Sequence, residues 1–236
     1  SEPYYVPFKG DANYRGYPSV LRDELFRQVE ALYERRIPVA IHCNGDASID
    51  DGLDAIEAAM AAHPWPEARP LIIHAQMTRK DQIDRMAQLG VTPSFFSAHT
   101  YYWGDRHAAI FMGPERAANM SPARWALDAG IRFSSHLDTP VTPMLPLQAV
   151  WSQVERESTG GAVIGPAQRI GRMPALRAVT IDAAWQVFME DEIGSIESGK
   201  RADLVVLSEN PLTAEDIRGI KVDRTVIDGA TVYARL

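Results

Sequence analysis

The sequence predicts an α/β fold with a parallel sheet, and three observations support this fold class. Short apolar runs alternate with helical patterns between residues 18 and 134. Gly or Pro lies in most of the connections between them. Each apolar run leads to side chains that can bind a metal ion: His42, His74, His99, and His136 with Asp138. A strand that closes on His or Asp is typical of a barrel strand whose C-terminal end opens into an active site.

The chain is expected to begin with a loop, because residues 1–17 are rich in Tyr, Pro and Gly and show no apolar period. An amphipathic helix is predicted over residues 18–36, with Ser19 as its N-cap. Its apolar face is formed by Leu21, Leu25, Val29 and Leu32. The first strand is predicted at residues 39–42.

Helices and strands then alternate along the chain. The predicted elements are a helix at 48–62, a strand at 70–74, a helix at 80–89, a strand at 91–96, a helix at 122–129 and a strand at 131–134. Residues 101–113 are aromatic and Gly-rich, and no regular structure is predicted there. Units of this kind form a right-handed parallel sheet, and the pattern supplies four of the eight strands of a closed barrel.

The pattern changes after Pro143. The predicted elements are a helix at 146–155, a Gly-rich loop at 160–171, a helix at 174–188, a strand at 203–207 and a hairpin over 224–233 that turns at Asp228-Gly229. We therefore predict two domains, a partial barrel over residues 1–188 and a β appendage over residues 189–236.

Composition excludes several classes of function. The 236 residues carry a net charge of -7, and Lys and Arg form no basic stripe, which argues against nucleic-acid binding. No apolar run approaches the roughly 20 residues of a membrane span. The single cysteine, Cys43, cannot form an internal disulfide, which fits a reducing compartment, and we expect a cytoplasmic location.

His42 and His74 are the strongest candidates for metal ligands. A lone histidine of this kind more often forms a hydrogen bond to a core carbonyl than a binding site. These two, however, occupy equivalent places in successive β/α units, which favours one shared site of the zinc type. Asp46 lies close behind His42 in the sequence, and its carboxylate can accept a hydrogen bond from a ligating imidazole.

Asp138 lies four residues beyond the last predicted strand of the sheet. One of its carboxylate oxygens can bind a metal ion while the other accepts a proton from water, so Asp138 is the candidate catalytic base. The alternative is a turn or cap before Pro140, a role in which Asp is common.

His99, His136 and Tyr102 are the candidate substrate-binding residues. Both histidines lie just beyond strand ends, where an imidazole can hydrogen-bond a substrate carbonyl or only fix a loop. Tyr102 belongs to an aromatic segment that favours an apolar group in the pocket, although aromatic residues also pack in many loops. His63 precedes Pro64 at the opposite end of the predicted sheet and is interpreted as structural.

Two motifs are rejected. Residues 194–200 match most of a phosphate-binding loop, but Arg201 replaces the required Ser or Thr and a strand follows instead of a helix. Cys43 lies next to His42, but successive strand side chains face opposite sides of a sheet. We therefore expect Cys43 to pack beneath a helix.

Several segments together resemble the metal-dependent amidohydrolases, in particular the branch of N-substituted formamide deformylases and YtcJ-like proteins. They are HCNGDA at 42–47, LIIHAQ at 71–76, LGVTPS at 89–94, HLDTPV at 136–141 and GSIESGKRADLVVL at 194–207. The resemblance implies that the chain is the C-terminal half of a (β/α)8 TIM barrel, strands five to eight, plus part of a small β-sandwich. It assigns metal binding to His42 and His74, and metal binding with general-base catalysis to Asp138.

The chain also departs from this family. The His-x-His pair of strand one and the lysine of strand four are absent, and the resemblance places Ser1 just after that lysine. Leu137, preceded by His136, stands where the family usually has Ser.

The expected function is metal-dependent hydrolysis of a non-peptide amide or related carbon–nitrogen bond in a small-molecule substrate, with one or two divalent ions, zinc by preference. The chain alone is expected to be inactive, and to associate with itself or with the missing N-terminal portion. The alternatives are a non-catalytic small-molecule-binding protein on a degenerate barrel and a metal-dependent ester or lactone hydrolase.

Overall fold

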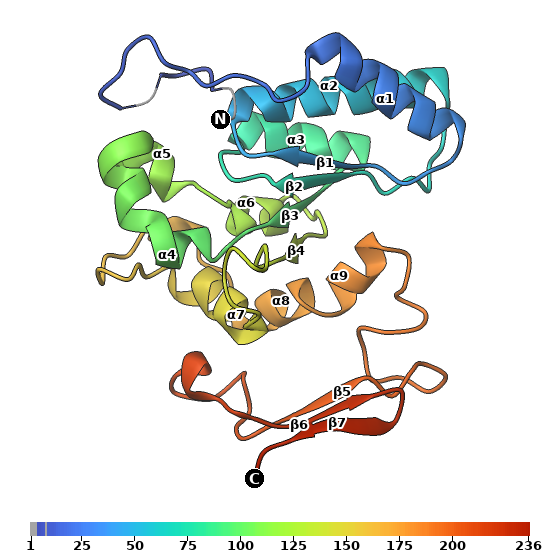
Figure 1. Cartoon of the computed structure of the whole chain (residues 1–236), viewed down its shortest axis with the longest axis vertical. Coiled ribbons are helices and arrows are strands. Elements are labelled where there is room, and N and C mark those ends of the chain that lie inside the picture. Colours follow the sequence, from blue (N-terminus) through green and yellow to red (C-terminus); the bar gives the residue numbers. More distant parts are fainter. Residues whose placement is uncertain (1–3, 8) are drawn as a thin grey trace.

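The computed structural model describes residues 4–7 and 9–236. Its first sheet is parallel, with the strands side by side in chain order (Figure 1). They are β1 (Ala40–Cys43), β2 (Leu71–His74), β3 (Thr92–Phe95) and β4 (Ser134–Ser135). The four predicted parallel strands are confirmed, although β4 is only two residues long.

Helices on the β1 side of the sheet are α1 (Arg22–Glu34), α2 (Asp46–Ala62) and α3 (Lys80–Leu89), stacked together in Figure 1. Their core is fully buried and consists of Ile49, Leu53, Ile56, Ile72, Ile83 and Met86. Helix α2 approaches the strands closely at Gly52, where an added Cβ would lie 3.2 Å from Ile72 Cδ1. The apolar residues that recur at helical spacing in the sequence therefore form the interface between the helices and the sheet.

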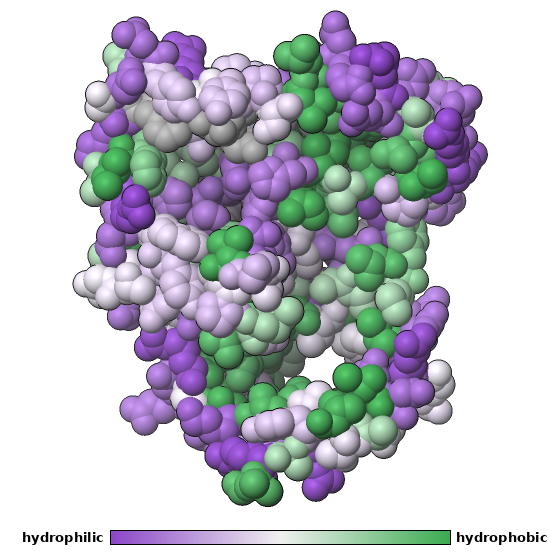
Figure 2. All heavy atoms as spheres, in the orientation of Figure 1, coloured by the Kyte–Doolittle hydropathy of each residue, from purple (hydrophilic) through white to green (hydrophobic). Residues whose placement is uncertain are grey.

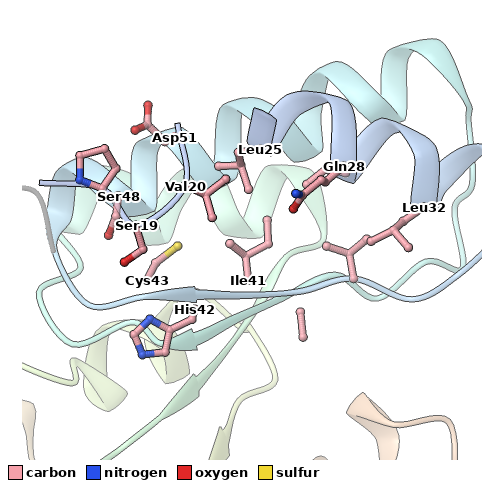
Figure 3. Close-up of a pocket in the computed structure, with 14 residues that line it drawn as sticks. Ser19, Val20, Leu25, Gln28, Leu32, Ile41, His42, Cys43, Ser48 and Asp51 are labelled. Carbon is pink, nitrogen blue, oxygen red and sulfur yellow. The ribbon is translucent and has the colours of Figure 1, made fainter. Parts of the chain in front are cut away.

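The start of α1 differs from the prediction. The helix begins at Arg22 and its N-cap is Leu21, which makes no side-chain capping bond, so Ser19 is not the cap. A Ser before an apolar period is a common capping signal, but here Ser19 lines a cavity of about 400 Å³ between α1 and β1 (Figure 3).

Residues 101–113 were expected to lack regular structure, and this expectation is wrong. The segment contains α4 (His99–Arg106), a π-helical turn η1 (His107–Phe111) and, just beyond it, α5 (Pro114–Ala118). The helix propensity of this segment is weak, and tertiary packing stabilises the helices instead. At Gly104, for example, Ile164 packs so closely that an added Cβ would lie 2.8 Å from Ile164 Cγ1.

The next helices are α6 (Ala123–Asp128) and α7 (Pro146–Glu155), close to their predicted bounds. The helix predicted at 174–188 is two helices, α8 (Arg172–Ala178) and α9 (Ile181–Gln186), separated at Thr180, whose backbone is not helical. A short turn of 3₁₀ helix, η2 (Pro166–Gln168), lies in the Gly-rich loop. Figure 1 shows α7, α8 and α9 on the β4 side of the sheet.

The C-terminal segment forms a three-stranded antiparallel sheet of β5 (Leu204–Leu207), β6 (Val222–Ile227) and β7 (Ala230–Ala234), with a 3₁₀ turn η3 (Ile217–Gly219) before β6. The hairpin turn at Asp228-Gly229 is confirmed, with φ of +49° and +78°. Many apolar side chains of this sheet are exposed: Leu204, Val205, Val206, Ile227, Val232 and Tyr233. Figure 2 shows green, apolar atoms over this end of the molecule.

Gly165 provides a stability test of the loop between α7 and α8. Its φ is +62°, and an added Cβ would lie 1.7 Å from the Ala118 carbonyl oxygen. Gly161 also has a positive φ, +81°, but nothing lies within 4 Å of an added Cβ.

We therefore expect Gly161→Ala to cost about 1 kcal/mol of unfolding free energy, the price of the backbone conformation alone. Gly165→Ala adds a collision with the backbone and should cost at least about 2 to 3 kcal/mol. Urea unfolding of the two variants measures the difference, and equal losses would contradict the packing described for Gly165.

Candidate active site at the carboxyl ends of the parallel strands

His42 and His74 come together at the ends of adjacent strands. Their ring centroids are 4.3 Å apart, with the planes nearly perpendicular at 78°. His42 is exposed, and His74 is 4% exposed. In Figure 3, Cys43 points toward the helices and His42 points to the opposite side of β1. Cys43 is buried, so its expected position beneath a helix is confirmed.

The backbone at His74 is left-handed, with φ of +69°, and Ala75 follows with +46°. His74 pairs in register with Cys43, so a regular strand would direct its side chain toward the helices as well. The left-handed residue instead ends β2, and the ring lies beside His42. Residues other than Gly adopt this conformation at a cost, and such strain is concentrated at functional sites.

His136 extends the cluster from the β4 side. Its ring centroid is 4.9 Å from that of His74, and the ring stacks on Phe96 at 5.3 Å. Burial lowers the pKa of His136, while the Asp138 carboxylate and a hydrogen bond to the Ser94 carbonyl raise it. Within the part of the chain that the structure describes, His136 Nε2 is buried without a hydrogen-bond partner. Nε2 is therefore a ring nitrogen that can bond a group outside the described residues, and it is an acceptor in the tautomer that carries the proton on Nδ1.

His99 begins α4, and its ring is 4.4 Å from that of Phe96. Burial lowers the pKa of His99 to about 3, with further contributions from the neighbouring histidines. His99 Nδ1 also lies 3.2 Å from Nε2 of His107 and 3.2 Å from Nε2 of Gln76. Burial lowers the pKa of His107 to about 4.

Sequence reasoning missed Gln76 and His107. The available signals were the position of Gln76 two residues beyond His74 and the spacing of eight between His99 and His107. The second spacing is informative only if residues 99–107 are helical, and no helix was predicted there.

Asp138 is exposed, and its backbone is left-handed with φ of +52°. Its carbonyl accepts a hydrogen bond of 2.7 Å from Val141 N, so the residue does form a turn. Its carboxylate is near enough to raise the pKa of His136. Both residues line a cavity of about 370 Å³, together with Leu137, Thr139, Met144 and Ala149.

Tyr102 is half-buried and packs in an apolar cluster with Phe96 and Leu137. Leu137 is itself buried in this cluster, which explains why an apolar residue stands at that position. His63 Nε2 lies 3.6 Å from Glu30 Oε1, a contact that fits the structural role expected for it.

Asp46 lies at the N-terminus of α2 and is 7% exposed. Its Oδ1 accepts hydrogen bonds from Tyr5 N and Ala47 N, and its Oδ2 is 3.8 Å from Arg79 Nη1. Through these contacts Asp46 stabilises the start of α2 and its packing against the N-terminal segment. A hydrogen bond from Asp46 to a ligating histidine stays a prediction.

The residues fit part of a metal site. Two imidazoles that meet edge to face can direct nitrogen atoms at one ion, as zinc requires. In residues 4–7 and 9–236, no three His, Cys, Asp or Glu side chains form a group that could hold a metal ion. The chain therefore brings two imidazoles together, and the Asp138 carboxylate lies near the neighbouring His136 ring.

The fold and the cluster define the class: an α/β protein with its polar site at the carboxyl ends of parallel strands. The chain belongs to the amidohydrolase family, whose sequence profile matches residues 1–233.

Two curated relatives and one solved structure show the extent of the similarity. The chain is 34% identical to the N-substituted formamide deformylase of Arthrobacter pascens over 84% of its length and 37% of that protein. It is 26% identical to the putative amidohydrolase YtcJ of Bacillus subtilis, over 97% of the chain and 44% of that protein. An uncharacterized metal-dependent hydrolase from Pyrococcus horikoshii aligns with a TM-score of 0.78 and 25% identity, over 91% of this chain and 42% of that one. The chain thus spans less than half the length of these proteins.

Among the described residues, no helix has the length and apolar character to cross a bilayer.

Proposed function

We propose that this chain is the C-terminal part of a metal-dependent hydrolase that cleaves a non-peptide carbon–nitrogen bond in a small molecule. The observation that carries the proposal is the meeting of His42 and His74 at the ends of adjacent parallel strands. Its relative from Arthrobacter pascens, an N-substituted formamide deformylase, supports a substrate with an N-substituted amide.

In this proposal β1 to β4 are strands five to eight of a (β/α)8 barrel. Two features support it: the sheet is open at both edge strands, and Ala40 and His42 are exposed on the face of β1 opposite the helices. Residues 1–188 then form the partial barrel, and residues 189–236 supply strands of a β-sandwich. Open parallel edges favour association with the N-terminal portion or with a second copy. Cys43 is buried and is the one cysteine of the 236 residues, so they form no internal disulfide, which fits a reducing compartment, and we place the protein in the cytoplasm.

His42, His74 and Asp138 are the residues that would hold the ion, and zinc suits two imidazoles and a carboxylate. A divalent ion, when bound, activates water for attack on the substrate carbonyl. The intact protein would hold one or two ions, with the remaining ligands supplied by the N-terminal portion.

Each candidate residue has a role in this proposal, and two of them, His136 and Asp138, line the same cavity. The Asp138 carboxylate accepts the proton of the attacking water and later donates it to the leaving amine. His136, neutral because burial lowers its pKa, accepts a hydrogen bond from the substrate N–H at Nε2. His99 would hydrogen-bond the substrate carbonyl, and Tyr102, which packs in the apolar cluster with Phe96, would contribute to the apolar wall.

The experiment uses the intact protein that contains this chain. N-benzylformamide and benzyl formate are offered as substrates before and after chelator treatment and zinc addition. The proposal predicts release of benzylamine that is lost with the chelator and restored by zinc. Faster cleavage of the ester would favour the ester or lactone hydrolase. Saturable binding of small amides without turnover of either compound would favour the non-catalytic binding protein and contradict the proposal.

A further inference from the structure

Gln76, His99 and His107 form a triangle of nitrogen atoms beside the His42–His74 pair. Gln76 Nε2 is 3.2 Å from His99 Nδ1 and 3.1 Å from His107 Nε2, and the two ring nitrogens are 3.2 Å apart. The three side chains come from the segment after β2, the first residue of α4 and the first residue of η1. Gln76 is 3% exposed, and its Nε2 is 4.0 Å from the buried Met120 sulfur.

Hydrogen bonds alone cannot satisfy all three contacts. If the amide nitrogen donates to both rings, both ring nitrogens are acceptors, and their lone pairs face each other. If the amide turns so that Oε1 accepts from both rings, two N–H groups face each other instead. Any assignment of protons therefore leaves one of the three contacts between two donors or between two acceptors. Such a contact is costly because the groups are buried.

A cation satisfies all three groups at once. Ligands about 2.0 Å from a tetrahedral ion lie about 3.3 Å from one another, close to the edges of this triangle. A half-turn of the Gln76 amide brings Oε1 to the position of Nε2, which gives a ligand set of two imidazoles and one oxygen. Low pKa values keep both imidazoles neutral, the form that ligates.

We infer that Gln76, His99 and His107 form a second site for a first-row divalent cation such as Zn²⁺ or Co²⁺, separate from His42 and His74. A tetrahedral ion held by these three groups keeps a fourth position for water or another ligand, and the Met120 sulfur is 4.0 Å from Gln76 Nε2. Arg106 lies next to His107 in the sequence, and its charge also acts on that ring, so binding is weaker than at a closed structural zinc site. Only Nδ1 of His99 is used, which leaves its other nitrogen for substrate.

The test removes the first pair of ligands so that the second site is measured alone. The 236-residue chain with His42→Ala and His74→Ala is stripped with a chelator and titrated with Co²⁺ alone, by calorimetry and by visible absorption. We expect one Co²⁺ per chain with the intense bands of a four-coordinate ion.

Two further variants in this background decide the ligands. Gln76→Glu supplies a charged oxygen at the same position and should tighten Co²⁺ binding about tenfold. His107→Phe should weaken it at least about tenfold, whereas the matched control His63→Phe, at the Glu30 contact, should not change it.

Equal affinity in the background, Gln76→Glu and His107→Phe proteins would overturn the inference, as would the absence of any bound Co²⁺. If His107→Phe fails to fold, the direction of the Gln76→Glu change still decides. Because His42 and His74 are absent throughout, failure here leaves the proposed hydrolase unaffected.

Discussion

Asp138→Asn is expected to lower the turnover of the intact protein about 100-fold or more, while most of the bound metal remains. The amide keeps the size of the carboxylate and one oxygen that can reach an ion, but it removes the oxygen that accepts the proton of water. Asp138 lines the same cavity as His136 and influences the pKa of that ring, and this position supports the role proposed for its carboxylate.

Metal content and turnover are measured on the same preparation. Asp128→Asn, at an exposed carboxylate that pairs with Arg124, is the matched control and should keep wild-type turnover. The turn that Val141 N closes on the Asp138 carbonyl tolerates Asn as well as Asp. Wild-type turnover in Asp138→Asn would therefore mean that Asp138 has only a structural role in the turn and is not the catalytic base.

Arg156→Met is expected to cause the largest loss of stability, about 3 to 5 kcal/mol. Arg156 is 2% exposed at the C-cap of α7. Its guanidinium donates to four carbonyl oxygens, at distances from 2.7 to 3.4 Å: those of Ile164, Met120, Ser121 and Ala118. Methionine fills a similar volume but leaves these buried oxygens without the donor.

Burial lowers the pKa of Arg156 only to about 10, so the side chain is charged at neutral pH and its bonds are charge-assisted. Arg169→Met is the control, because that exposed guanidinium donates, among the described residues, to the Glu155 carbonyl alone; its loss should cost less than about 1 kcal/mol. Urea unfolding measures both variants, and similar losses would contradict the role assigned to Arg156.

The parallel sheet was predictable because its signals are local. An apolar run, a helical period and a Gly or Pro between them are visible in residues 39–96, and β1 to β3 and α3 lie within about one residue of prediction. The helices between His99 and Ala118 were not predictable in this way. They are stabilised by contacts with distant residues, such as Gly104 with Ile164, and their aromatic residues carry little helix propensity.

The candidate site was predictable only in part. Equivalent positions in successive β/α units identified His42 and His74, and the structure brings their rings together. The carboxyl end of the sheet also collects Gln76 and His107, which follow no strand period. For Asp46 the spacing suggested a histidine partner, which stays a prediction; the structure adds hydrogen bonds from Tyr5 N and Ala47 N to its Oδ1, which one sequence does not reveal. Which partners these side chains contact depends on three-dimensional distances, which cannot be read from one sequence.

Anomalous diffraction at the zinc edge, from crystals of the intact protein stripped with chelator and reloaded with zinc, tests directly whether His42 and His74 bind the metal ion. We expect an anomalous peak about 2.0 to 2.1 Å from a ring nitrogen of both His42 and His74. Zinc bound elsewhere, with both of these rings unligated, would contradict the assignment of this pair as the metal ligands of the hydrolase.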